Sequence, residues 1–341
     1  MSAVVSKVTK RRSNVLDVLR GSPIMGPLAA LVLASIFFAT QSDKFLSGAN
    51  FSLIIQQVMV VGMLAIGQTL VILTGGIDLS NGMIMALSSV LMTGLAVRSG
   101  MHPLLAILVG LLACIAFGML NGSLITAIGL PPFIVTLGTF NIAYALVRIY
   151  TTATITGLPR ELLFLGNTFN IGGTEITYGS VLMVILYALT WYVLRSTPAG
   201  RAVYAVGDNP EAARLAGINT KRVLTAVYTV AAITYGIAGL LLVSRTGVGD
   251  PQAGQTGNLE SITAVVLGGT SLLGGRGQSG VHSVGGVVQT LSVLLRVAHD
   301  GTHQRDLRAH GRLQRGEQQI RISLQARRVP EQARQGWRGC E

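Results

Sequence analysis

Residues 52–74, SLIIQQVMVVGMLAIGQTLVILT, contain no charged side chain. A helix that crosses a lipid bilayer needs about 17–25 mostly apolar residues, because lipid offers no partner for backbone N–H and C=O groups. The stretch therefore predicts a transmembrane helix. The whole chain agrees, since 50% of its 341 residues are hydrophobic and only 12% are charged. This composition excludes an ordinary soluble domain.

Seven further apolar stretches resemble this one, and we expect about eight spans, the last of them shorter and interrupted by glycines. The seven lie at about 24–40, 83–97, 104–127, 132–149, 178–194, 223–244 and 259–274. The predicted fold is thus all-α, a polytopic transmembrane helical bundle. No A-x-A cleavage site follows the first stretch, so we expect a retained helix rather than a signal peptide.

The net charge of +12 predicts the orientation of the bundle. Lysine and arginine gather in cytoplasmic loops of membrane proteins, and here they cluster in the N-terminal segment 1–23 and again in the loop 195–222. Six spans separate the two clusters, so both fall on one side. We expect a cytoplasmic N-terminus, a cytoplasmic loop 195–222 and an outside loop 150–177.

The loop 195–222 contains a short helix signal. Asn209 is a favoured N-cap, Pro210 suits the first helical position, and Glu211 lies where the helix dipole favours a carboxylate. Gly217 is expected to end the helix, because glycine readily adopts the left-handed conformation found after helix C-termini. These local features leave two interpretations equally open. The segment is either a solvated loop helix without a partner or an element that docks on another protein.

Paired glycines and a carboxylate, Gly75, Gly76 and Asp78, interrupt the apolar run after residue 74. An ionisable residue at membrane depth is costly and is a candidate functional residue. The alternative is a turn at the cytoplasmic end of a span, with Asp78 capping the next helix. We expect a structural break near the cytoplasmic gate, with direct solute contact as the second possibility.

Neutral amides within the predicted spans are candidates for the translocation path. Gln68, Asn121 and Asn141 suit a polyhydroxyl solute, and hydrogen bonding between helices is the alternative for each. Gly118 and Gly122 form a GxxxG pattern, which favours close helix packing.

Several functional classes find no support in the sequence. There is no GxxxxGK[ST] phosphate cradle, so hydrolysis of a nucleotide must occur in another protein. We expect no catalytic residues, no metal site, no cofactor bound by this chain and no nucleic-acid partner. An ATP-independent secondary transporter or channel for a small polar solute remains the alternative, although it should show more intramembrane charges or inverted repeats.

Four motifs in order carry a resemblance to a known family: 67-GQTLVILTGGIDLSNG-82, 129-GLPPFIVTLGT-139, 204-YAVGDNPEAARLAGI-218 and 261-SITAVVLGGTSLLGGRG-277. The chain resembles the membrane permease subunits of bacterial ABC sugar importers of the ribose, fructose and xylose type, in the branched-chain amino acid/ribose permease family. The resemblance implies a permease domain over residues 24–277.

The resemblance implies that the loop 195–222 holds the coupling helix that docks on a cytoplasmic ATPase subunit. The implied contact residues are Arg201, Asn209, Pro210, Glu211, Ala212, Ala213 and Gly217. It also implies an inner-membrane complex with a second permease copy and a periplasmic sugar-binding protein, in which the partner subunit uses the ATP. The motifs look most similar to a fructose-type permease, and ribose and xylose remain open.

Residues 278–341 depart from the family pattern, which would supply about ten spans. From Arg296 onward the chain contains ten arginines and no lysine. No stretch after Ala298 is apolar enough to cross a bilayer. A lipid-binding basic tail and a disordered tail are two interpretations. We favour a third, in which the reading frame has shifted near Gly277.

Overall fold

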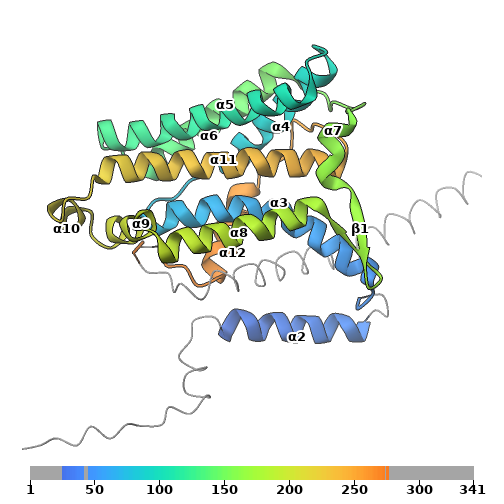
Figure 1. The fold of residues 1–341 in the computed structure, drawn as a ribbon, viewed down its shortest axis with the longest axis horizontal. Helices are drawn as coiled ribbons and strands as arrows, with labels where there is room; N and C mark the ends of the chain where they lie inside the picture. Colours follow the sequence, from blue (N-terminus) through green and yellow to red (C-terminus); the bar gives the residue numbers. More distant parts are fainter. Residues whose placement is uncertain (1–24, 42–44, 273, 276–341) are drawn as a thin grey trace, which may run out of the picture. The chain divides into compact units, whose positions relative to one another are not determined.

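The computed structural model describes residues 25–41, 45–272 and 274–275. The N-terminal segment 1–23 and the basic tail 278–341, about which the sequence makes predictions, lie outside the described residues. The described chain forms a bundle of helices with a small hairpin at one end (Figure 1).

Helices occur at all eight positions predicted as spans. They are α2 (Met25–Gln41), α3 (Gly48–Leu73), α4 (Asn81–Val97), α5 (Pro103–Ser123), α6 (Pro132–Tyr150), α8 (Tyr178–Ser196), α11 (Thr220–Thr246) and α12 (Gly257–Leu267). A π-helical turn, η1 (Leu124–Ile128), extends α5. Within the described residues, α3, α5 with η1, α6, α8 and α11 are long and apolar enough to cross a membrane. The fold class predicted from the sequence is therefore confirmed.

The last predicted span is short and ends at glycines, as the sequence indicates, but its helix ends earlier than the predicted stretch. The apolar pattern predicts 259–274, but α12 ends at Leu267 after 11 residues. Gly268 follows it, and Gly269 has a φ of 87°, which breaks the helix. A helix of this length is too short to span the hydrocarbon layer on its own.

Smaller elements connect the spans at the two ends of the bundle. They are α7 (Arg160–Leu163), η2 (Phe164–Gly166), β1 (Thr168–Ile171), β2 (Thr174–Thr177), α9 (Pro198–Asp208) and α10 (Pro210–Leu215). The two strands pair antiparallel around Gly172 and Gly173, which both have positive φ. The polar composition of 150–177 predicts only a loop, yet a Gly-Gly pair between alternating residues is a hairpin signal.

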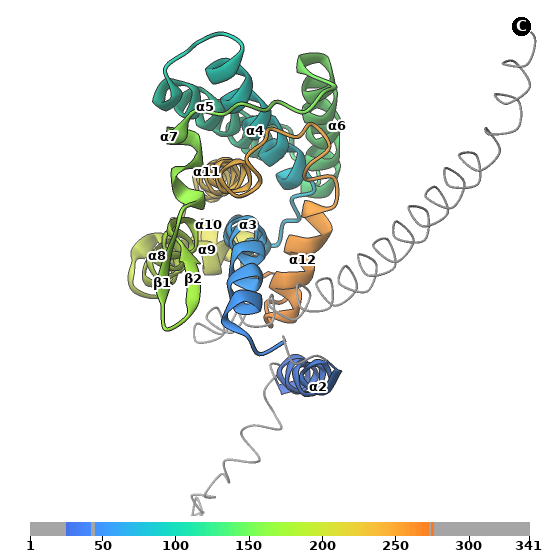
Figure 2. The same ribbon diagram turned by 90° about the vertical axis from the view of Figure 1, so that its right-hand side faces the viewer.

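Helix α11 forms the centre of the bundle. It packs against α3, α4 and α5, and it buries Tyr228, Tyr235 and Leu241 completely. Figure 2 shows α11 between α3 and the α4–α5 pair. Much less of α5, α6 and α8 is buried than of α3 and α11, as expected for helices whose outer faces meet lipid.

Loops predicted on the same side of the membrane lie at the same end of the bundle. At one end, backbone atoms of Gly207 and Leu73 come into contact. At the other end, Ile155 and Gly249 form an isolated β-bridge, and Arg98 donates a hydrogen bond to Thr151 Oγ1 over 2.9 Å. Figure 1 shows α9 and α10 at one end and α7 and β1 at the opposite one.

The GxxxG pattern lies where α5 meets α11. A Cβ on Gly118 would lie 2.6 Å from the Tyr228 carbonyl oxygen and 2.7 Å from Ala232 Cβ, and one on Gly122 would lie 2.7 Å from Thr225 Cα. The interpretation of this pattern as close helix packing is therefore confirmed.

We predict that Gly118→Ala lowers the free energy of unfolding by about 1–3 kcal/mol, because the added methyl group must push α5 away from α11. Thermal denaturation of the detergent-solubilised chain measures the effect. Gly138→Ala in α6 is the matched control, since its Cβ would meet nothing within 4 Å. Equal loss of stability in both variants would contradict the packing role.

Candidate functional site

The chain turns back into the bundle between α3 and α4. After Leu73 the segment 74–80 is non-helical, and α4 begins at Asn81, which bonds to Gln68 about one and a half turns before the end of α3. The next residue, Gly82, is in backbone contact with Gly254, just before α12. Helix α4 therefore begins inside the bundle, in contact with the chain just before α12.

Thr136 on α6 and the segment's own Asp78 pair with the backbone of the segment 74–80. The N–H of Leu79 donates to Thr136 Oγ1 over 3.1 Å, and the same hydroxyl lies 3.1 Å from the Ile77 carbonyl oxygen, to which it can donate. Asp78 Oδ1 accepts from the N–H of Ser80 at 2.8 Å and from its hydroxyl at 2.6 Å. These bonds allow a non-helical backbone to lie among apolar helices.

Two connected sets of polar side chains surround this segment. Asn121 Nδ2 donates to Ser80 Oγ over 3.1 Å, and Thr139 Oγ1 donates to Asn121 Oδ1 over 2.8 Å. On the other side, Asn81 Nδ2 donates to Gln68 Oε1 over 3.0 Å and to Ser261 Oγ over 2.7 Å. We call these residues the polar seam: Gln68, Asp78, Ser80, Asn81, Asn121, Thr136, Thr139 and Ser261.

Three residues singled out in the sequence, Gln68, Asp78 and Asn121, therefore come together. Each is at most 1% exposed. The other five members of the polar seam were missed, yet all of them lie within the membrane motifs 67–82, 129–139 and 261–277. Their position in those motifs could have identified them, because a polar side chain within an apolar stretch needs a hydrogen-bond partner when it is buried.

The remaining candidates lie at the edges of the seam or away from it. Gly75 has a φ of 78° and is exposed, while a Cβ on Gly76 would lie 2.5 Å from the Tyr228 hydroxyl. Asn141 is exposed on α6, and its Nδ2 donates to the carbonyl oxygen of Leu137 on the same helix. The structure thus separates Asn141 from the other candidates.

The polar seam holds helices together in this conformation. Its members come from α3, α4, α5, α6, α12 and the segment 74–80, and they are buried. Within the described residues, no group of three or more His, Cys, Asp or Glu side chains comes together. The arrangement supplies neutral hydrogen-bonding groups and one carboxylate, which is chemistry suited to binding polar groups rather than to covalent catalysis.

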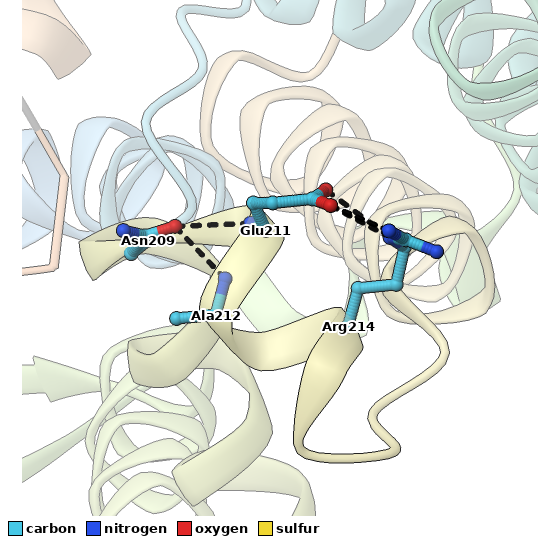
Figure 3. A network of polar contacts seen from close by, with 4 residues as sticks. All are labelled: Asn209, Glu211, Ala212 and Arg214. Atoms are coloured by element: carbon cyan, nitrogen blue, oxygen red, sulfur yellow. Dashed lines mark hydrogen bonds and ion pairs between the residues drawn. The ribbon is translucent and has the colours of Figure 1, made fainter.

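The second candidate site is α10, at the end of the bundle where the segment 74–80 leaves α3. Asn209 is its N-cap, as predicted, and its Oδ1 accepts from the N–H groups of Glu211 at 3.0 Å and Ala212 at 2.9 Å (Figure 3). Pro210 occupies the first turn, and Gly217 has a φ of 86° directly after the C-cap Ala216. The sequence-based prediction of this helix is confirmed.

The outer surface of α10 carries an exposed ion pair. The Arg214 guanidinium lies 2.5 Å from a Glu211 carboxylate oxygen, and its hydrogen bonds hold the pKa of that carboxyl group below its ordinary value (Figure 3). Ala212 is exposed, whereas Ala213 is buried against the rest of the chain. The second alanine therefore supports the helix from beneath.

Other exposed side chains extend this surface. Leu215, the last residue of α10, is 77% exposed, and Arg201 on α9 is also exposed. Lys221 and Arg222 add positive charge at the start of α11. The end of the bundle around α10 is therefore a basic surface that also carries the acidic Glu211 and a projecting leucine.

Comparison with known proteins places the chain among membrane permeases. The family described as branched-chain amino acid transport system / permease component matches residues 50–295. The match includes the polar seam and α10, and it extends beyond residue 277.

Curated relatives cover most of the chain. The fructose import permease protein of Rhizobium meliloti is 48% identical over 266 residues, which are 76% of this chain and 74% of that protein. The ribose import permease protein of Bacillus subtilis is 41% identical over 257 residues, 74% of this chain and 79% of that protein. The autoinducer 2 import system permease protein of Photorhabdus laumondii is 34% identical over 254 residues, 73% of this chain and 75% of that protein. No solved structure matches the chain.

We predict that Asn121→Ala destabilises the folded chain by about 1–3 kcal/mol, because it takes from Ser80 and Thr139 a buried hydrogen-bond partner. Thermal denaturation in detergent measures the loss. Asn141→Ala is the matched control and should change stability little, since it removes only an exposed bond within one helix. A larger loss at Asn141 than at Asn121 would rule out the structural role of the polar seam.

Proposed function

Because the chain belongs to the branched-chain amino acid transport system / permease component family, we propose that it is the membrane subunit of an ATP-driven importer for a monosaccharide. The chain is a permease and not an enzyme, and ATP hydrolysis belongs to a separate subunit. The observation that carries the proposal is the family match over residues 50–295, which includes the buried polar seam and the exposed α10.

The proposed solute is fructose or a ribose-like sugar. The relatives named for fructose and ribose import are 48% and 41% identical to this chain. Neutral amides and hydroxyls predominate in the polar seam, and such groups suit a polyhydroxyl solute better than an ion. In the proposed importer a periplasmic binding protein delivers the sugar.

We assign the contact with the ATPase subunit to α10 and its surroundings. The proposed contact and supporting residues are Arg201, Asn209, Pro210, Glu211, Ala212, Ala213 and Gly217. Two features support the assignment. The helix projects at one end of the bundle, and its cap and the buried Ala213 keep it folded without a partner.

We assign the gate of the path to the segment 74–80 and the polar seam. Gly75 and Gly76 permit the turn into the bundle, Asp78 and Asn121 hold the segment through Ser80, and Gln68 holds the start of α4 through Asn81. Asn141 lies outside the polar seam. If it contacts the solute, it does so at a part of the translocation path away from the polar seam.

The chain is a multi-pass membrane protein, and we propose that it lies in the bacterial inner membrane with a cytoplasmic N-terminus. In this orientation α10 faces the cytoplasm and the hairpin β1–β2 faces outward. The proposed complex holds a second permease copy, ATPase subunits and the binding protein. The family match reaches residue 295, so the reading-frame shift that the sequence placed near Gly277 is proposed only for the residues after 295, outside the described chain. Sequencing the coding DNA tests it, because apolar helices should then be encoded there in another frame.

We predict that the full-length chain co-purifies with the ATPase subunit encoded beside it, and that fructose or ribose with the binding protein stimulates ATP hydrolysis by the reconstituted complex. Stimulation is expected because an importer couples solute delivery to hydrolysis. Phosphate release and uptake of radiolabelled sugar into proteoliposomes are the measurements. Sugar uptake by the chain alone, without ATPase or ATP, would instead establish an ATP-independent transporter.

We also predict that Glu211→Lys weakens association with the ATPase subunit at least about tenfold, because the reversed charge breaks the pair with Arg214 and repels any basic group that meets Glu211. Binding to the immobilised ATPase measures the change. Glu175→Lys in β2 is the control, since Glu175 is exposed at the opposite end of the bundle. Unchanged binding of the Glu211 variant would remove the assignment.

A further inference from the structure

Three segments that are distant in sequence meet backbone to backbone beside α10. They are the end of α3 at Leu73–Gly75, the end of α9 at Gly207–Asp208, and the pair Gly274–Gly275 after α12. We call this contact the glycine junction. Neither the family match nor the names of the relatives assigns it a role.

The packing at the glycine junction leaves no room for a side chain. A Cβ on Gly207 would overlap the carbonyl oxygen of Leu73. A Cβ on Gly274 would lie 2.8 Å from both the nitrogen and Cα of Gly75, and one on Gly275 would lie 2.5 Å from Asp208 Cα. The N–H of Gly275 also donates a hydrogen bond to the carbonyl oxygen of Leu73 over 3.1 Å.

The junction lies between the two candidate sites. Toward the surface, Gly207 is the penultimate residue of α9, and Asn209 alone separates α9 from α10. Toward the interior, Gly75 lies at the start of the segment 74–80, which leads to Asp78 and the polar seam. No flexible linker intervenes on either side, since the residues 71–81 and 203–215 are helix, turn or hydrogen-bonded segment.

We propose that the glycine junction is the positioning contact through which movement of α10 shifts the segment 74–80 and loosens the polar seam. A contact made of backbone atoms cannot repack by rotamer changes, so displacement of α9 must move the end of α3 or separate from it. The proposal rests on the proposed function, since it assumes that α10 receives the movement of the ATPase subunit.

The first test compares Gly207→Ala with Gly138→Ala in the full-length complex with its ATPase and binding protein. The added methyl group at Gly207 must separate α9 from Leu73, whereas the one at Gly138 meets nothing within 4 Å. We expect both variants to assemble and to keep basal ATP hydrolysis. In Gly207→Ala, sugar transported per ATP hydrolysed should fall about tenfold, while Gly138→Ala should keep the wild-type ratio.

A merely structural role would lower the thermal stability of Gly207→Ala and leave the ratio of transport to hydrolysis unchanged, and that result would overturn the proposal. Failure of the wild-type chain to form a complex, or to show stimulation by sugar, would instead overturn the proposed function. The two failures are therefore distinguishable.

A second measurement uses the wild-type complex and covers the case in which Gly207→Ala does not assemble. Hydrogen exchange is followed with and without a non-hydrolysable ATP analogue. We expect amide protection to change together in residues 203–215 and 74–80. A change confined to 203–215 would overturn the proposal, because the segment 74–80 would then not follow α10.

Discussion

The fold depends on one constraint, that a non-helical backbone inside an apolar bundle must find its hydrogen-bond partners within the protein. The segment 74–80 breaks off from α3 and enters the bundle, and Thr136, Asp78 and Ser80 pair with its peptide groups or with one another. Asn121 in turn donates a hydrogen bond to Ser80, and Thr139 donates one to Asn121, so the segment is tied to α5 directly and to α6 through Asn121. A group of polar residues that would be costly in lipid thus becomes the reason why five helices keep one arrangement.

Helix α10 needs stabilisation from its surroundings, because six residues are too few to form a stable helix alone. Asn209 supplies two hydrogen bonds at its start, Ala213 packs against the chain beneath it, and Gly217 releases the backbone after it. The exposed ion pair between Glu211 and Arg214 adds little stability in solvent. Its charges can contribute to recognition, because the cap and the buried alanine already maintain the helix.

Much of this architecture follows from local patterns that the sequence displays directly. Apolar stretches predicted a helix at each of the eight span positions, and Asn209, Pro210 and Gly217 predicted α10, whereas α9 lies in a segment that was predicted only as a loop. Hydrogen bonds between residues far apart in the sequence could not be predicted from these local patterns. The bonds from Asn81 to Gln68 and Ser261, and from Asn121 to Ser80, join residues whose proximity depends on how the chain re-enters the bundle. For the last span the sequence predicted a short run interrupted by glycines, but it did not predict where the helix ends, because apolar residues continue past the glycines that stop it.

Several glycines of this glycine-rich chain have a clear packing role in the structure. Gly118 lets α5 approach α11, Gly82 lets the starts of α4 and α12 meet, and Gly207 lets α9 touch the end of α3. At each place the contact is between backbones, or between a backbone and a short side chain, so little freedom remains for local repacking. Contacts of this kind transmit rigid-body displacement rather than absorb it. A bundle whose outer helices face lipid and whose inner contacts are this close is suited to moving as a few coupled pieces.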